Sequence, residues 1–141
     1  MSNSIPAPLQ SGQPSENMVT VTHLVYALHA FAVFSAVVGS ATIIFSFIAS
    51  LPSIAAVVLN YWNQTAVRGT WLESHFRWQI RTFWFAVLWV AVAVLMGLTI
   101  VGLPFALAVL LLAGVWILYR VVRGWWVLIQ RRTLPVPPPR I

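Results

Sequence analysis

The residues best suited to chemistry in this chain lie in one short stretch, residues 68–82 (RGTWLESHFRWQIRT). It contains five side chains that could line one polar site with the carboxylate as general base: Glu73, His75, Arg77, Gln79 and Arg81. The alternative is a membrane-interface helix with snorkelling arginines and interfacial tryptophans. In this alternative Glu73 is a counter-ion for Arg77, which lies four residues later in the same helix. We favour the second interpretation and keep the polar site as the other.

The rest of the sequence offers no partner for catalysis at this stretch. Cysteine is absent, so thiolate metal sites, disulfides and thiol nucleophiles are excluded. His23 and His29 have no carboxylate or second histidine four residues away, so we assign them no ligand role. We therefore expect no catalytic residue, no metal site and no cofactor, and we predict that the protein is not an enzyme.

Composition predicts the surroundings in which these residues work. The chain has 141 residues, of which 60% are hydrophobic and 7% charged, whereas soluble domains have roughly 25% charged residues. The sequence thus predicts an all-α, polytopic integral membrane protein of one domain, surrounded largely by lipid. The net charge is +6 and every basic residue is arginine, but the arginines flank apolar runs, which favours a role in topology over nucleic-acid binding.

The N-terminal half poses the main structural question. Residues 1–19 form a polar tail that we expect to be disordered, with no signal-peptide features. Residues 21–62 carry no charge, and as one helix they would be about 60 Å long, twice the hydrocarbon thickness. A break at residues 39–42 gives two spans and a bundle of four hydrophobic helices. A break at residues 49–52 gives one long span and a short re-entrant or interfacial helix, hence three full spans. We favour the first.

The C-terminal half is simpler. A helix from Thr70 should run directly into a span over residues 83–99, and a turn at residues 97–104 should lead to a last span over residues 105–119. The transmembrane domain then covers residues 20–132. Residues 133–141 form a Pro-rich tail with polyproline II character.

Charge predicts the orientation. Residues 68–81 and the C-terminal part hold all eight arginines, and the turn at residues 97–104 has no charge. By the positive-inside rule the arginine-containing parts, with the C-terminus, are cytoplasmic. The expected contacts with anionic lipid headgroups are arginines and tryptophans after the last span: Arg120, Arg123, Trp125, Trp126, Arg131 and Arg132.

Three motifs in order resemble those of a family of small bacterial membrane proteins of unknown function. They are Leu59-Asn60-Tyr61, the stretch RGTWLESHFRWQIRTFW at residues 68–84, and YRVVRGW at residues 119–125. That family is distantly similar to the chloroplast inner-envelope protein-import (Tic) membrane subunit. The resemblance covers about residues 20–134 and is most specific at ESHFRWQ, residues 73–79. It implies an all-helical protein of the bacterial inner membrane, and a translocation function only by analogy of fold.

Two functions follow as expectations. The first is a non-enzymatic accessory or scaffold module whose basic cytoplasmic face binds anionic lipid or a membrane partner. The alternative is an oligomeric channel, transporter or translocation component, which needs several copies because four helices enclose little lumen. The expected partners are membrane lipids, and beyond them further copies of the chain or another membrane protein, with no nucleic acid.

Overall fold

The computed structural model describes residues 12–38 and 43–135, and these residues form four α-helices and no strand. The helices are α1 (Glu16–Val38), α2 (Ile43–Asn63), α3 (Leu72–Gly97) and α4 (Leu103–Ile129). At 1.5 Å per residue they are about 31–40 Å long, comparable with a hydrocarbon core of about 30 Å. The all-α prediction is confirmed, and α1, α3 and α4 are also apolar enough to cross a membrane.

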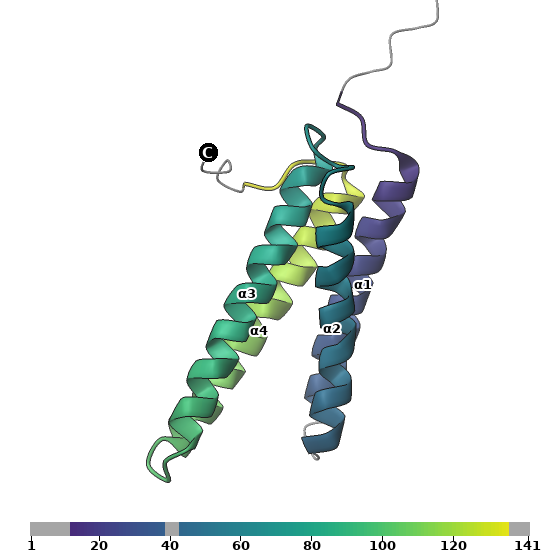
Figure 1. The fold of residues 1–141 in the computed structure, drawn as a ribbon. Helices are drawn as coiled ribbons and strands as arrows, with labels where there is room; N and C mark the ends of the chain where they lie inside the picture. The colour runs from purple at the N-terminus through teal and green to yellow at the C-terminus, as the bar shows by residue number, and fades with distance from the viewer. Residues whose placement is uncertain (1–11, 39–42, 136–141) are drawn as a thin grey trace, which may run out of the picture.

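The four helices form two antiparallel hairpins. Helix α1 packs along α2, and α3 packs along α4 (Figure 1). The hairpins meet at the end of the molecule that holds the start of α1, the connection of residues 64–71 and the end of α4, and they diverge toward the turn at residues 98–102 (Figure 1). Chain segments far apart in the sequence are therefore brought together at one end only.

The first two helices are divided at the first of the two predicted places. Helix α1 ends at Val38 and α2 begins at Ile43, while residues 39–42 themselves lie outside the described residues. Pro52 lies inside α2, which has 21 residues. The alternative, a long first helix followed by one of about a dozen residues, is therefore wrong.

The helical part starts earlier than the predicted boundary at residue 20. Helix α1 begins at Glu16 because Ser15 caps it: the Ser15 carbonyl oxygen accepts from the Met18 amide at 2.9 Å, and the Ser15 hydroxyl accepts from the same amide at 3.4 Å. The negative charge of Glu16 in the first turn complements the helix dipole. The predictions of disorder over residues 1–11 and of polyproline II over residues 136–139 lie outside the described residues.

Helix α4 continues beyond the predicted end of its span at residue 119. It runs to Ile129, so Arg120, Arg123, Trp125 and Trp126 are helical residues. The arginines mark a change from apolar to polar surroundings, but arginine has a high helix propensity and does not end a helix. The turn before α4 is where the glycine and proline signals predicted it.

The buried core lies at the end where the hairpins meet. Its largest fully buried members include Tyr26, Phe76, Leu72 and Leu128, contributed by three helices. Gly124 allows α1 to approach α4 here, since a Cβ atom at this position would lie 2.5 Å from the Tyr26 hydroxyl oxygen. The core and this close approach hold together the end of the molecule at which most polar side chains gather.

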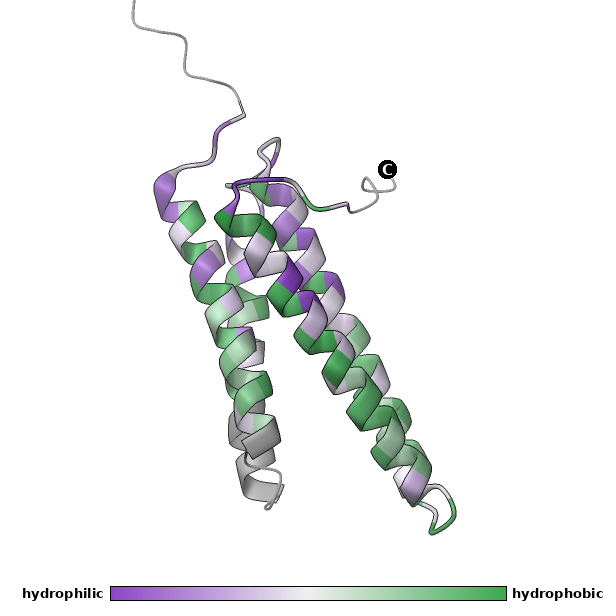
Figure 2. Cartoon of the chain, turned by 180° about the vertical axis from the view of Figure 1, so that it is seen from behind, coloured by the Kyte–Doolittle hydropathy of each residue, from purple (hydrophilic) through white to green (hydrophobic). Residues whose placement is uncertain are grey.

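The outer surfaces of the hairpins are apolar. Hydrophobic residues dominate the coloured parts of the diverging hairpins, and hydrophilic ones gather where the hairpins meet (Figure 2). Ile100 is 94% exposed and Leu95 is 68% exposed. Water is a poor solvent for such a surface, and its composition is consistent with one that faces lipid.

Candidate functional site

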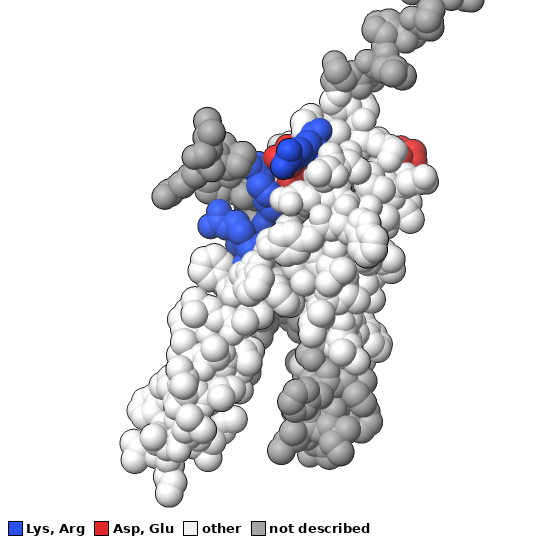
Figure 3. All heavy atoms as spheres, viewed as in Figure 1, with Lys and Arg blue, Asp and Glu red and all other residues white. Residues whose placement is uncertain are grey.

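The polar end of the molecule, called the basic end below, carries the arginines of the described residues. Those visible in Figure 3 gather there, over α3 and the nearby chain ends. The members are Arg68, Arg77, Arg81, Arg120, Arg123, Arg131 and Arg132. Both groups of candidate residues from the sequence lie at this end.

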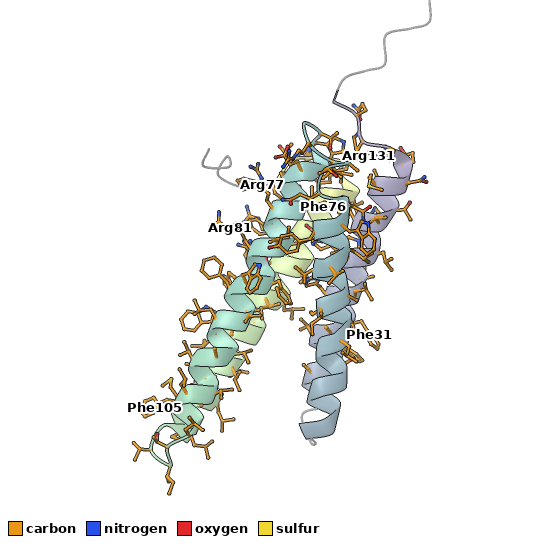
Figure 4. The ribbon with its side chains drawn as sticks, viewed as in Figure 1. Phe31, Phe76, Arg77, Arg81, Phe105 and Arg131 are labelled. Atoms are coloured by element: carbon orange, nitrogen blue, oxygen red, sulfur yellow. The ribbon has the colours of Figure 1, made fainter. Side chains whose placement is uncertain are left out.

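The five residues of the predicted polar site divide between two faces of α3. Arg77 and Arg81 project away from the other helices (Figure 4). His75 and Gln79 are buried, at 0% and 3% exposure. Glu73 accepts from the backbone amide of Gly69 at 2.9 Å. The structure therefore brings His75 and Gln79 together with other helices and leaves the charged members on the outer face.

The outer face contains the predicted pair. An Arg77 guanidinium nitrogen lies 3.9 Å from a Glu73 carboxylate oxygen, and both side chains are partly exposed. A pair at this distance with partly exposed side chains contributes about 1 kcal/mol at most. The Glu73 carboxylate also fixes the turn at Gly69, which has φ +74°. Glu73 therefore acts within its own helix and the preceding turn.

His75 joins three parts of the chain. Its Nε2 lies 2.7 Å from the Arg132 carbonyl oxygen, and its Nδ1 lies 3.1 Å from the Tyr26 hydroxyl oxygen. A carbonyl oxygen only accepts, so Nε2 carries the proton and donates, and Nδ1 accepts from the Tyr26 hydroxyl. In this neutral tautomer both ring nitrogens are hydrogen-bonded. The His75 side chain thereby links α1, α3 and the chain after α4.

The segment after α4, residues 130–135, crosses the start of α3. We call it the C-terminal strap. Arg131 turns it with φ +53°. The Leu134 amide donates to the Ser74 hydroxyl at 3.0 Å, and the Leu134 side chain is only 4% exposed. The packed structure therefore continues through Leu134, past the predicted boundary at residue 132.

Arg120 lies between α3 and α4. Its Nε donates to the Thr82 hydroxyl at 2.7 Å, and a terminal nitrogen donates to the Trp78 carbonyl oxygen at 3.3 Å. The guanidinium carbon lies 3.5 Å from the centroid of the Trp78 ring, a cation–π geometry. The Trp78 indole N–H donates in turn to the Arg120 carbonyl oxygen at 3.2 Å. Arg120 is thus committed to holding α3 against α4.

The other side chains predicted to contact headgroups differ in whether they already have a partner within the protein. The Trp125 indole N–H donates to His23 Nδ1 at 3.1 Å, which ties α4 to α1. Arg131 forms a two-pronged ion pair with Glu16 at 3.0 and 3.2 Å. Glu16 can pair with Arg131 because the residue belongs to the first turn of α1 and not to the expected tail. Three of the predicted contacts remain exposed without a carboxylate among the described residues: Arg123, Trp126 and Arg132.

Two of these exposed residues border a hollow on the outer face of α4. The hollow has a volume of about 420 Å³ and an almost entirely apolar lining. Its residues form one stripe at helical spacing: Val115, Leu118, Tyr119, Val122, Arg123 and Trp126. A cationic group and an indole thus lie at one end of an apolar groove.

Known proteins give no independent assignment. The chain matches no protein-family model, no curated protein and no solved structure. Within residues 12–38 and 43–135, no three histidine, cysteine or carboxylate residues lie close enough to hold a metal ion. The function therefore has to be argued from the basic end itself.

Sequence reasoning missed the inward connections of the site. Tyr26 and Gly124 were not identified as contact residues from the sequence. Gly124, which stands between an arginine and two tryptophans in α4, could have indicated a close contact between helices. His29 was set aside, yet it is only 5% exposed and belongs to a polar group between the hairpins. Spacing within one helix could not identify these partners because they come from other helices.

Proposed function

We propose that this chain is an integral membrane protein of the bacterial inner membrane with four spans. We infer that it is a non-enzymatic accessory or scaffold module whose basic end binds anionic lipid headgroups on the cytoplasmic side. The observation that carries the lipid proposal is the hollow on α4, in which an exposed arginine ends an apolar groove. The motifs shared with the small bacterial membrane family support the inner-membrane assignment by resemblance alone.

The groove fits the chemistry of an anionic lipid. An acyl chain would lie along Val115, Leu118 and Val122, while the phosphate would meet the Arg123 guanidinium. Trp126, which is 66% exposed, would lie at headgroup depth, where indole rings are favoured. Arg123 is the better headgroup ligand than Arg120. Arg120 is held between two helices by its hydrogen bonds to Thr82 and Trp78, whereas Arg123 is exposed and donates only to the Tyr119 hydroxyl of its own helix.

The alternative of a channel or transporter has less support. The space between the hairpins is lined mainly by apolar side chains, which do not replace the hydration shell of an ion. A conducting path would have to form between copies of the chain. Flux measurements in liposomes distinguish this alternative from the lipid-binding module.

Replacing Arg123 by Gln should weaken the retention of cardiolipin or phosphatidylglycerol about fivefold, because one arginine near anionic lipid contributes about 1 kcal/mol. The measurement is native mass spectrometry of the protein released from nanodiscs. The matched control is Arg68→Gln, which removes the same charge from the exposed connection before α3. Equal losses in both variants would mean that only total charge matters, and no loss in either would refute anionic-lipid binding.

Topology is tested separately. A reporter fused after Ile141 should be active in the cytoplasm, and one inserted at residues 99–102 should be active on the other side of the membrane. With four spans, a reporter before Met1 should also be cytoplasmic. An N-terminal and a C-terminal reporter on opposite sides would contradict four spans, whatever the lipid measurements show.

A further inference from the structure

A cleft separates the two hairpins where they diverge. Its volume is about 390 Å³, and residues from all four helices line it. Figure 3 shows the hollow between the hairpins. Most of the lining is aliphatic, with Val33, Ile54 and Val90 as examples. The volume lies in the range of about 300–1,000 Å³ that small-molecule sites occupy.

Two polar residues of the cleft wall also border a second, smaller cavity. His29 and Thr82 line the cleft, and the same two residues line a small cavity of about 10 Å³ between α1, α3 and α4. Gln79 lines this small cavity as well. The apolar cleft and the small cavity therefore share two residues of their walls.

The hydrogen bond of His29 determines what its free nitrogen can do. Nδ1 lies 2.9 Å from the Val25 carbonyl oxygen, and this oxygen only accepts, so Nδ1 carries the proton. In the neutral ring Nε2 is then an acceptor. It is buried and has no hydrogen-bond partner among the described residues. A group that satisfies His29 must donate a hydrogen bond.

Gln79 supplies the complementary groups. Its side chain is 3% exposed, and both the amide oxygen and the amide nitrogen are buried without a partner in the described part of the chain. Buried polar atoms without a hydrogen bond are costly, about 1–3 kcal/mol each. The small cavity beside the cleft is thus bordered by an acceptor on His29 and by both a donor and an acceptor on Gln79.

We propose that the cleft binds a neutral single-chain lipid that ends in a hydroxyl group. The hydroxyl donates to His29 Nε2 and accepts from the Gln79 amide, and the hydrocarbon chain lies between the hairpins. A cavity of about 10 Å³ has room for one such oxygen, but not for a phosphate. The nearby Arg120 guanidinium is hydrogen-bonded to Thr82 and Trp78. This site is separate from the hollow on α4, with which it shares no lining residue.

The test uses a photoactivatable long-chain alcohol with a diazirine in the middle of its chain, and its methyl ether as the control probe. The purified full chain in detergent is labelled, and the labels are mapped by peptide mass spectrometry. The alcohol should label the cleft walls, residues 29–36, 53–54 and 82–90, about tenfold more than the ether, which cannot donate to His29. Excess hexadecanol should abolish this labelling.

Variants assign the effect to the proposed contacts. His29→Leu and Gln79→Leu should each reduce labelling by the alcohol to the level of the ether. Ile54→Trp, at a half-exposed position on the cleft wall, should block both probes without disturbing the buried group. Leu111→Trp, on the exposed face of α4, is the control and should change nothing. Equal labelling by the alcohol and the ether, or full labelling of Ile54→Trp, would overturn the proposal and leave the small cavity as a place for water.

Discussion

Replacing Gly124 by Ala is expected to push α1 away from α4 and to lower the free energy of unfolding by about 2 kcal/mol. The added Cβ would lie 2.5 Å from the Tyr26 hydroxyl oxygen and 2.8–2.9 Å from two ring carbons. Tyr26 is 1% exposed, so its ring has no free space to enter. Overpacking costs about 1–3 kcal/mol, and loss of the bond from Tyr26 to His75 adds about 1 kcal/mol. Thermal and denaturant unfolding in detergent measure the effect.

Gly114→Ala is the matched control in the same helix. Nothing lies within 4 Å of a Cβ atom at Gly114, so only the helix propensity changes, and alanine should stabilise by up to about 1 kcal/mol. In a Tyr26→Ala background the cost of Gly124→Ala should disappear, since the clashing ring is gone. If the two glycine variants behave alike, the close approach of α1 to α4 does not limit stability.

Replacing His75 by Leu should destabilise the protein by about 2–4 kcal/mol and release the C-terminal strap. The substitution leaves the buried Tyr26 hydroxyl without its partner, which costs about 1–3 kcal/mol, and it removes the hydrogen bond to the Arg132 carbonyl oxygen, which costs about 1 kcal/mol more. We expect trypsin to cleave after Arg131 and Arg132 faster when the strap detaches, because the backbone there is then free of its contacts with α3. The variant should therefore show a lower unfolding temperature and faster cleavage at these two sites.

Ser74→Ala provides the comparison for the strap. It removes only the hydroxyl that accepts from the Leu134 amide, so it should increase cleavage with a loss of stability of about 1 kcal/mol. His75→Leu lowers stability more because it also disconnects α1. A His75→Leu protein that is as stable and as protease-resistant as the original would show that the three-way connection is not important for the fold.

Much of the architecture could be predicted because it depends on local properties of the chain. Glycine and proline near residues 97–104 predicted the turn before α4, and the helical spacing after Thr70 predicted that α3 would continue into the next apolar segment. The predicted boundary of the N-terminal tail was wrong, because Ser15 starts α1 within it. Helix α4 is also longer than the span predicted over residues 105–119. Arginines mark a change in the surroundings of a helix and not its end.

The candidate site could be predicted only in part. Helical spacing correctly paired Glu73 with Arg77, because the partners lie on one helix. It could not show that Arg120 turns inward to Thr82, nor that Arg131 reaches Glu16, 115 positions away. The sequence therefore identified the basic residues without deciding which of them are free to bind a ligand.

The sequence by itself determined that most of this protein is apolar helix and that its arginines flank the apolar runs, because hydropathy and helix signals are properties of neighbouring residues. The tertiary structure decided which face of each helix is buried. In an apolar helix the core-facing and lipid-facing sides have similar side chains, so hydropathy does not distinguish them. The contacts of His75 with residues 49 and 57 positions away depend on that choice of face. They arise only when α1, α3 and the C-terminal strap pack together, because a hydrogen bond needs its donor and acceptor within about 3 Å.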